Sequence, residues 1–83
     1  MQVSVRYFGI VGDMVRRKTD EVDLEDGATV ADLLAALVRD NPGFAPVAKQ
    51  VRAVVDGENA GRDLVLRPGS EVALMRAIGG GTQ

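Results

Sequence analysis

The chain contains neither cysteine nor histidine among its 83 residues. It therefore lacks a thiol nucleophile, an imidazole base and the usual zinc ligands. Disulfides are excluded too, although the missing cysteines do not identify a redox compartment. Only carboxylates, amines, hydroxyls and one tyrosine remain for chemistry. We therefore expect no catalytic site and no metal site, and a protein that is not an enzyme by itself.

Long hydrophobic runs are also missing. No apolar stretch approaches the roughly 18 residues of a membrane-spanning helix, and the N-terminus lacks the layout of a signal peptide. The net charge is −2, with both signs interspersed, which disfavours binding to nucleic acid or to an anionic membrane. We expect a cytoplasmic protein that binds neither.

Alternating apolar residues predict two strands near the N-terminus. The first strand is expected over Gln2–Phe8 and the second over Lys18–Leu24, paired as an antiparallel hairpin. Gly9–Met14, with two glycines and an aspartate, is interpreted as the loop that joins them. Phe8 falls on the otherwise polar face of its strand. The inward-facing positions are Val3, Val5, Tyr7, Val22 and Leu24.

A single main helix is expected to follow. Thr29 is a good N-cap, with Asp32 as its partner in a capping box, and Asn41-Pro42-Gly43 ends the helix. The apolar stripe consists of Val30, Leu33, Leu34, Leu37 and Val38. Phe44, Pro46 and Val47 are expected in an irregular turn under this helix.

The last third of the chain predicts two more strands. The third strand covers Val51–Val55 and is closed by a turn over Asp56–Asn59. Leu64–Leu66 is interpreted as a connector, either one helical turn or a brief strand. After the turn at Arg67–Ser70, the last strand covers Glu71–Ala77, with Val72 and Leu74 inward and Ala73 and Met75 outward.

This order of elements predicts an α+β fold of the β-grasp, or ubiquitin-like, type. One main helix would cross a mixed sheet of four to five strands, whose first and last strands lie parallel at its centre. We expect the β-grasp domain to span residues 1–78 and a flexible glycine-rich tail to span 79–83. Three successive glycines are too flexible for a packed core, so the tail is the segment that the domain presents.

The sequence resembles the ubiquitin-like sulfur-carrier family, which includes the small subunit of molybdopterin synthase and the thiamine-pathway sulfur carrier. The resemblance covers nearly the whole chain. The matching segments are Val5–Gly9, Glu25–Leu34, Val55–Glu58, Arg67–Leu74 and Ile78–Gly81.

The resemblance implies that a C-terminal diglycine, here Gly80-Gly81, is the working part. A partner of the ubiquitin-activating type, an adenylyltransferase, would join the carboxylate of Gly81 to AMP from ATP. A persulfide sulfur would then displace AMP and leave a thiocarboxylate, which donates sulfur to an acceptor synthase subunit. The chain itself would bind no cofactor. From Arg76 to Gly81 an extended tail, including Gly79, could reach about 20 Å into a partner.

A partner-binding surface is expected at the root of the tail, formed by Phe8, Met75, Arg76 and Ile78. Phe8 and Met75 are outward positions near the ends of the first and last strands. If these strands are parallel neighbours, the two side chains meet. An exposed apolar pair on an open sheet face is typical of a protein interface, and the resemblance implies that this face docks the activating enzyme.

The sequence departs from the family pattern after the diglycine, where Thr82 and Gln83 follow. In the family, the mature tail ends in a free glycine carboxylate, whereas here Gly81 is in a peptide bond. We therefore expect the chain to be inactive until a peptidase cuts after Gly81. A zinc metalloprotease of the deubiquitinase-like (JAMM) type is the natural candidate. A second departure is Arg76-Ala77, where the molybdopterin synthase subunit often has two prolines.

Two other functions are compatible with these residues. The chain could be a protein modifier, joined through Gly81 to lysines of other proteins, or a non-covalent ubiquitin-like binding module with an inert tail. Isopeptide-linked species would favour the modifier. Unchanged function after deletion of residues 80–83 would favour the binding module. The pathway that uses the sulfur, whether for molybdopterin, thiamine, cysteine or tRNA thiolation, stays open.

Overall fold

The structure is a computed structural model, which describes residues 1–76. Its core is one five-stranded sheet with the strand order β2-β1-β5-β3-β4. None of the helices in residues 1–76 is long and apolar enough to span a membrane. The strands are β1 (Gln2–Tyr7), β2 (Thr19–Asp23), β3 (Val51–Val55), β4 (Glu58–Ala60) and β5 (Glu71–Arg76). The helices are α1 (Ile10–Val15), α2 (Val30–Asp40), the 3-10 turn η1 (Pro42–Phe44) and α3 (Ala45–Ala48).

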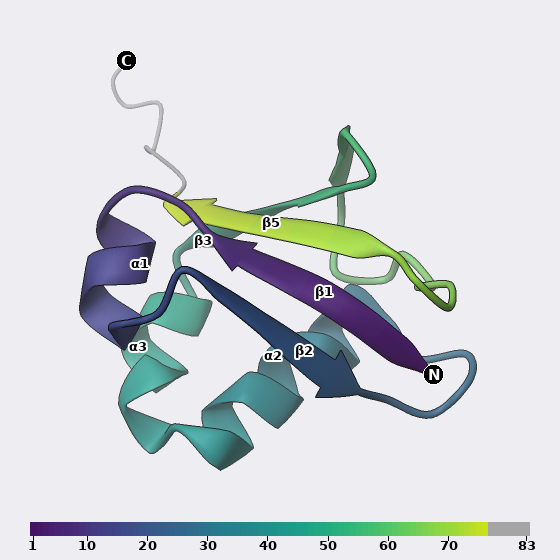
Figure 1. The fold of residues 1–83 in the computed structure, drawn as a ribbon, viewed down its shortest axis with the longest axis horizontal. Coiled ribbons are helices and arrows are strands. Elements are labelled where there is room, and N and C mark those ends of the chain that lie inside the picture. The colour runs from purple at the N-terminus through teal and green to yellow at the C-terminus, as the bar shows by residue number, and fades with distance from the viewer. Residues whose placement is uncertain (77–83) are drawn as a thin grey trace.

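The sheet has the predicted β-grasp topology (Figure 1). β1 and β5 are parallel neighbours, with Val5 opposite Val72 and Tyr7 opposite Leu74. β2 pairs with β1, and β3 pairs with β5, both in antiparallel orientation. Because β5 is third in the order, strands lie on both of its sides. The prediction of a mixed sheet with parallel first and last strands is confirmed.

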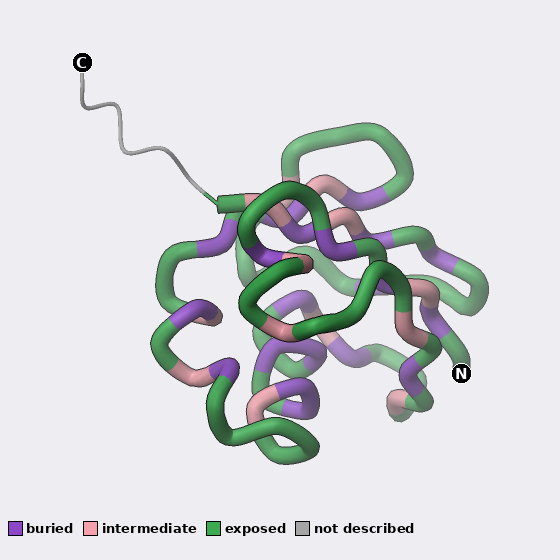
Figure 2. Tube along the Cα trace, turned by 60° about the vertical axis from the view of Figure 1, so that its left-hand side comes forward, coloured by how far each residue is buried: buried purple, intermediate pink, exposed green. Residues whose placement is uncertain are grey.

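The core lies between the sheet and α2, where the buried positions recur along strands and helix (purple in Figure 2). The capping box that begins α2 is present: the Asp32 amide donates to Thr29 Oγ1 at 3.2 Å, and the Thr29 amide donates to Asp32 Oδ2 at 2.9 Å. Leu24, which was predicted to face inward, is only partly buried, and so is Val38 of the apolar stripe. The most buried side chains are Phe44, Leu33, Leu74, Val3, Val5, Val11, Val30 and Val72.

The prediction of a loop over Gly9–Met14 is wrong, because Ile10–Val15 forms the helix α1. Val11 is only 1% exposed, so contact with the core stabilises a helix too short to form alone. Gly12 permits this contact: a Cβ there would lie 3.1 Å from the Tyr7 carbonyl oxygen and 3.2 Å from that of Arg17. The glycines that indicated a loop in fact allow a helix to pack tightly against the end of β1.

The connections around β4 also differ in detail from the prediction. The turn was expected to reach Asn59, yet its two central residues are Asp56 and Gly57, with φ of 49° and 87°, as a tight two-residue hairpin turn requires. Strand β4 begins at the next residue. Within the connector Leu64–Leu66, only Val65 makes a β-bridge, with Thr29, so the brief-strand interpretation is nearer than the helical one. Leu66 is buried in the core.

The single tyrosine offers a direct probe of the core. Tyr7 is buried, and burial followed by the negative charge of Asp20 raises its pKa to about 12. In the unfolded chain the phenol ionises near pH 10, at about the usual value. Between these two pH values the folded state holds a proton that the unfolded state has lost, so stability should fall as pH rises from 10 towards 12.

Absorbance of the phenolate would measure this pKa without ambiguity, because the chain has one tyrosine. Tyr7→Phe is the control for the stability change, since it removes only the phenolic hydroxyl and leaves every other titratable group in place. A phenolate transition near pH 10 in the folded protein would contradict the prediction.

Candidate functional site

The candidate site is the end of β5, from which residues 77–83 continue. At this end, the Phe8 amide donates a hydrogen bond of 2.9 Å to the Leu74 carbonyl. On the other side, Arg76 lies opposite Val51 of β3. The last described residue, Arg76, is therefore paired with β3, whereas the bond on the β1 side is made two residues earlier, at Leu74. The predicted tail residues Ile78, Gly79, Gly80 and Gly81 lie outside the described residues.

The structure brings Phe8 and Met75 together, as the register of the central strands requires. Tyr7 lies opposite Leu74 in the parallel pair, so the next position on each strand is Phe8 and Met75. Phe8 is 44% exposed and Met75 is partly buried. Arg76, the third predicted partner-binding residue, is exposed at the end of β5. That these residues bind a partner remains a prediction.

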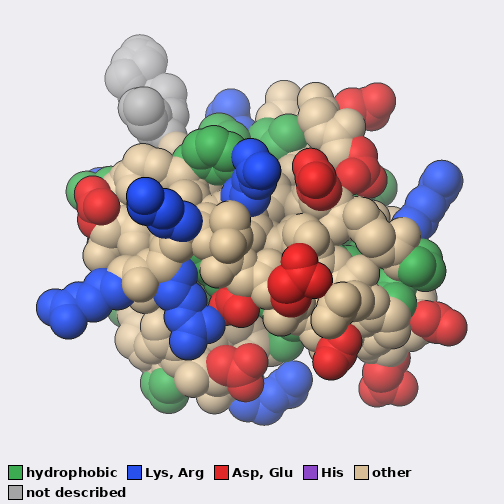
Figure 3. Space-filling view, in the orientation of Figure 1, with side chains coloured by type: hydrophobic (Ala, Val, Ile, Leu, Met, Phe, Trp, Pro, Cys, Tyr) green, Lys and Arg blue, Asp and Glu red, His purple; other side chains and the backbone are tan. Residues whose placement is uncertain are grey.

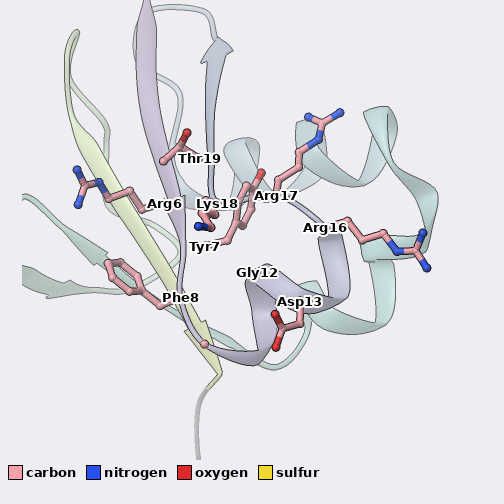
Figure 4. A pocket seen from close by; sticks show the side chains of 10 residues that line it. Arg6, Tyr7, Phe8, Gly12, Asp13, Arg16, Arg17, Lys18 and Thr19 are labelled. Carbon is pink, nitrogen blue, oxygen red and sulfur yellow. The ribbon is translucent and has the colours of Figure 1, made fainter.

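Two arginines on the same open face were missed by the sequence analysis. Arg6 lies opposite Ala73, and Arg52 lies opposite Met75. Figure 4 shows Arg6 and Phe8 on the side of β1 towards β5. The alternation within each strand placed both arginines outward, but only the register across strands shows that they flank the apolar pair. The open face at the end of β5 thus presents apolar side chains flanked by positive charge.

Helix α1 adds two exposed apolar side chains to this end of the molecule, which the prediction of a loop did not indicate. Ile10 is 48% exposed and Met14 is 56% exposed, and they lie one helical turn apart on the same face. Exposed apolar side chains in a row at the end of the molecule that carries the tail extend the candidate interface.

The chemistry available within residues 1–76 is limited. No group of three aspartate or glutamate side chains in this part of the chain could hold a metal ion. Every buried side-chain nitrogen or oxygen described there has a hydrogen-bond partner.

Replacing the exposed aromatic side chain tests this surface. Phe8→Ser should leave the free energy of unfolding nearly unchanged, because the ring is 44% exposed, and should weaken binding to an activating partner about tenfold or more, as for an apolar anchor. Val65→Ser is the matched control, since Val65 is 55% exposed and belongs to the connector rather than this surface. Isothermal titration calorimetry would measure the affinity of each variant for the activating partner. Equal affinities for the two variants would contradict the assignment.

Comparison with solved structures gives the same fold over almost the whole chain. Small archaeal modifier protein 1 of Haloferax volcanii is 25% identical, with a TM-score of 0.85 over 98% of this chain and 100% of that chain. A putative molybdopterin converting factor subunit 1 from Pyrococcus furiosus is 21% identical, with a TM-score of 0.82 over 94% of this chain and 99% of that chain. A third match is a chain in the complex of subunits 1 and 2 of the molybdopterin-converting factor from Helicobacter pylori. That chain is 15% identical, with a TM-score of 0.68 over 94% of this chain and 96% of that chain.

Comparison with sequences assigns the family. No curated protein matches the chain. The model of the ThiS family matches residues 5–81, which include the second half of β1, all the later strands and helices described, and the three glycines that follow them. Together with the β-grasp topology, this match places the chain among the ubiquitin-like sulfur carriers that its sequence resembles. The chain belongs to the ThiS family.

Proposed function

We propose that the protein is a sulfur carrier whose working group is the carboxylate of Gly81. One observation carries this proposal: the family match begins in β1 and ends at Gly81, and it stops before Thr82 and Gln83. The glycines follow β5, which is held on both sides within the sheet. A body of residues 1–78 would thus present a tail of residues 79–83.

The proposed chemistry explains why the tail needs glycine. A carboxylate is a poor electrophile, so an adenylyltransferase partner would couple Gly81 to AMP and release pyrophosphate from ATP. A persulfide sulfur would displace AMP, and a thiol would supply the electrons that release the thiocarboxylate. Nucleotide and sulfur must both approach the carbonyl closely, which the missing Cβ of glycine permits. The chain would be the substrate of this reaction, in the cytoplasm where ATP is available.

The partners follow from this chemistry. An adenylyltransferase would activate the tail, and a synthase subunit would accept the sulfur. The complex of subunits 1 and 2 of the Helicobacter pylori factor supports the second partner. We place both on the surface that contains Phe8 and Met75, with Arg76 and Ile78 at the start of the tail. We further propose that a JAMM-type metalloprotease first removes Thr82 and Gln83.

A mass measurement tests the proposal. Protein purified from its own cells should end at Gly81 and should include a form in which one carboxylate oxygen is replaced by sulfur. Alkylation of the thiocarboxylate should shift the mass of that form alone, because the chain has no cysteine. A tail that always retains Thr82 and never carries sulfur would overturn the proposal.

A second function, protein modification, is favoured by the similarity to small archaeal modifier protein 1 at 25% identity over 98% of this chain. Conjugation would use the same activated Gly81. Trypsin cuts after Arg76, so a conjugate should leave Ala77 to Gly81 on the acceptor lysine of another protein. Detection of this remnant in cell lysate would establish the modifier, and thiocarboxylate without any remnant would leave the carrier alone.

A further inference from the structure

An open hollow of about 740 Å³ lies next to the surface that contains Phe8 (Figure 4). Its walls come from the end of β1, from α1 and from the segment that joins α1 to β2. The hollow did not follow from the sequence, because α1 was not expected. We call it the basic hollow, after the four cations that line it: Arg6, Arg16, Arg17 and Lys18.

The basic hollow has an excess of positive charge. Among these four cations, only Arg17 forms an ion pair within residues 1–76, with Asp20 at 2.6 Å. Asp13 also lines the hollow and is its one acidic wall residue. In Figure 3, basic side chains gather at the end of the visible face that carries α1, and acidic side chains predominate towards the other end. A net positive concavity on a chain with net charge −2 is a local feature that requires an explanation.

The backbone at the C-terminal end of α1, which borders the basic hollow, has a defined conformation. Arg16 ends α1 in the left-handed region, with φ of 59° and ψ of 38°, where glycine or asparagine is preferred. Its amide donates to the Gly12 carbonyl, and Gly12 packs against Tyr7. Glycine or asparagine would fit position 16 with less backbone strain, but neither carries the positive charge that Arg16 places at the rim of the hollow. Such positions cluster at functional sites.

We propose that the basic hollow docks a carboxylate-rich segment of the partner protein that takes the tail. This inference rests on the proposed function only in that such a partner exists. Phe8 belongs both to the hollow and to the surface at the end of β5, so a protein bound over Phe8 reaches the hollow directly. The exposed ring of Phe8 adds an apolar wall to the basic rim, a combination that suits a segment mixing acidic and apolar residues.

Other anions fit these observations less well. A single phosphate would leave most of the roughly 740 Å³ volume empty. A nucleic acid would meet the negative charge that predominates towards the other end of the same face. Opposite charges on two protein surfaces mainly raise the association rate and select the partner. The basic hollow would thus choose which activating or accepting protein receives the tail.

A double substitution at the rim tests the docking site. Arg16→Asn with Lys18→Gln removes two cations and places a residue that accepts positive φ at position 16, so the fold should be retained or stabilised. The probe is a synthetic peptide of aspartate, glutamate and leucine, titrated into the full chain while amide shifts are followed by NMR. Arg39→Gln with Lys49→Gln is the matched control, which removes equal charge at residues that do not line the hollow.

The expected shifts are confined to amides of the hollow such as Gly9, Gly12 and Thr19. The rim variant should bind the peptide about tenfold more weakly, as two partly exposed charge pairs would give, and the control should bind as the parent does. Binding should also weaken with added salt.

Three outcomes would overturn the proposal: shifts spread over all basic residues, equal loss in both double variants, or inorganic phosphate binding the hollow as tightly as the peptide. The last would identify a small-anion site. None of these measurements requires sulfur chemistry, so a missing thiocarboxylate would refute the proposed function without affecting this result.

Discussion

A chain cut after Gly81 should support ATP–pyrophosphate exchange by its activating adenylyltransferase, whereas the chain that retains Thr82 should support none above background. Adenylation needs a free carboxylate, and in the longer chain the carbonyl of Gly81 belongs to a peptide bond with Thr82. The side chain that follows would also have to enter a channel shaped for glycine. Exchange of labelled pyrophosphate into ATP measures the activation step without any sulfur donor.

Two controls separate the position of the carboxylate from the shape of the tail. A chain ending at Gly80 has a free glycine carboxylate one residue short, and Gly81→Ala in the cut chain keeps the length but adds a Cβ. Both should lose most of the exchange if the partner measures length and excludes side chains. Equal exchange with the cut and uncut chains would show that Thr82-Gln83 masks nothing.

Leu33→Ala should lower the free energy of unfolding by about 2–5 kcal/mol, as other buried leucines do. Leu33 is 0% exposed and lies on the face of α2 that packs against the sheet. Small domains have only about 5–15 kcal/mol of stability in total, so this loss is a large share of it. The loss combines removed apolar contact with a cavity that the close-packed core fills only in part.

Leu64→Ala is the matched control, because it removes the same atoms from a leucine that is 41% exposed. Guanidinium titration should show a midpoint near that of the parent for the control and a much lower midpoint for Leu33→Ala, with equal slopes. A similar shift for the two variants would mean that α2 does not carry the core.

The sequence by itself determined the elements whose signals are local. Period-two alternation identified β1, β2, β3 and β5, and the Thr29–Asp32 pair identified the first turn of α2 because a capping box involves residues only three apart. The tail motif is local as well, so Gly80-Gly81 could be singled out from the printed sequence alone, and its role stays a prediction.

Tertiary structure alone decided what lies beside what. The helix α1 forms because Val11 reaches the core and Gly12 passes close to Tyr7, contacts that six residues cannot predict by themselves. The register across the sheet, and not the strand patterns, sets Arg52 opposite Met75. Periodicity says which side of a strand a residue faces, whereas a surface such as the basic hollow depends on segments distant in sequence, whose relative positions are set by packing.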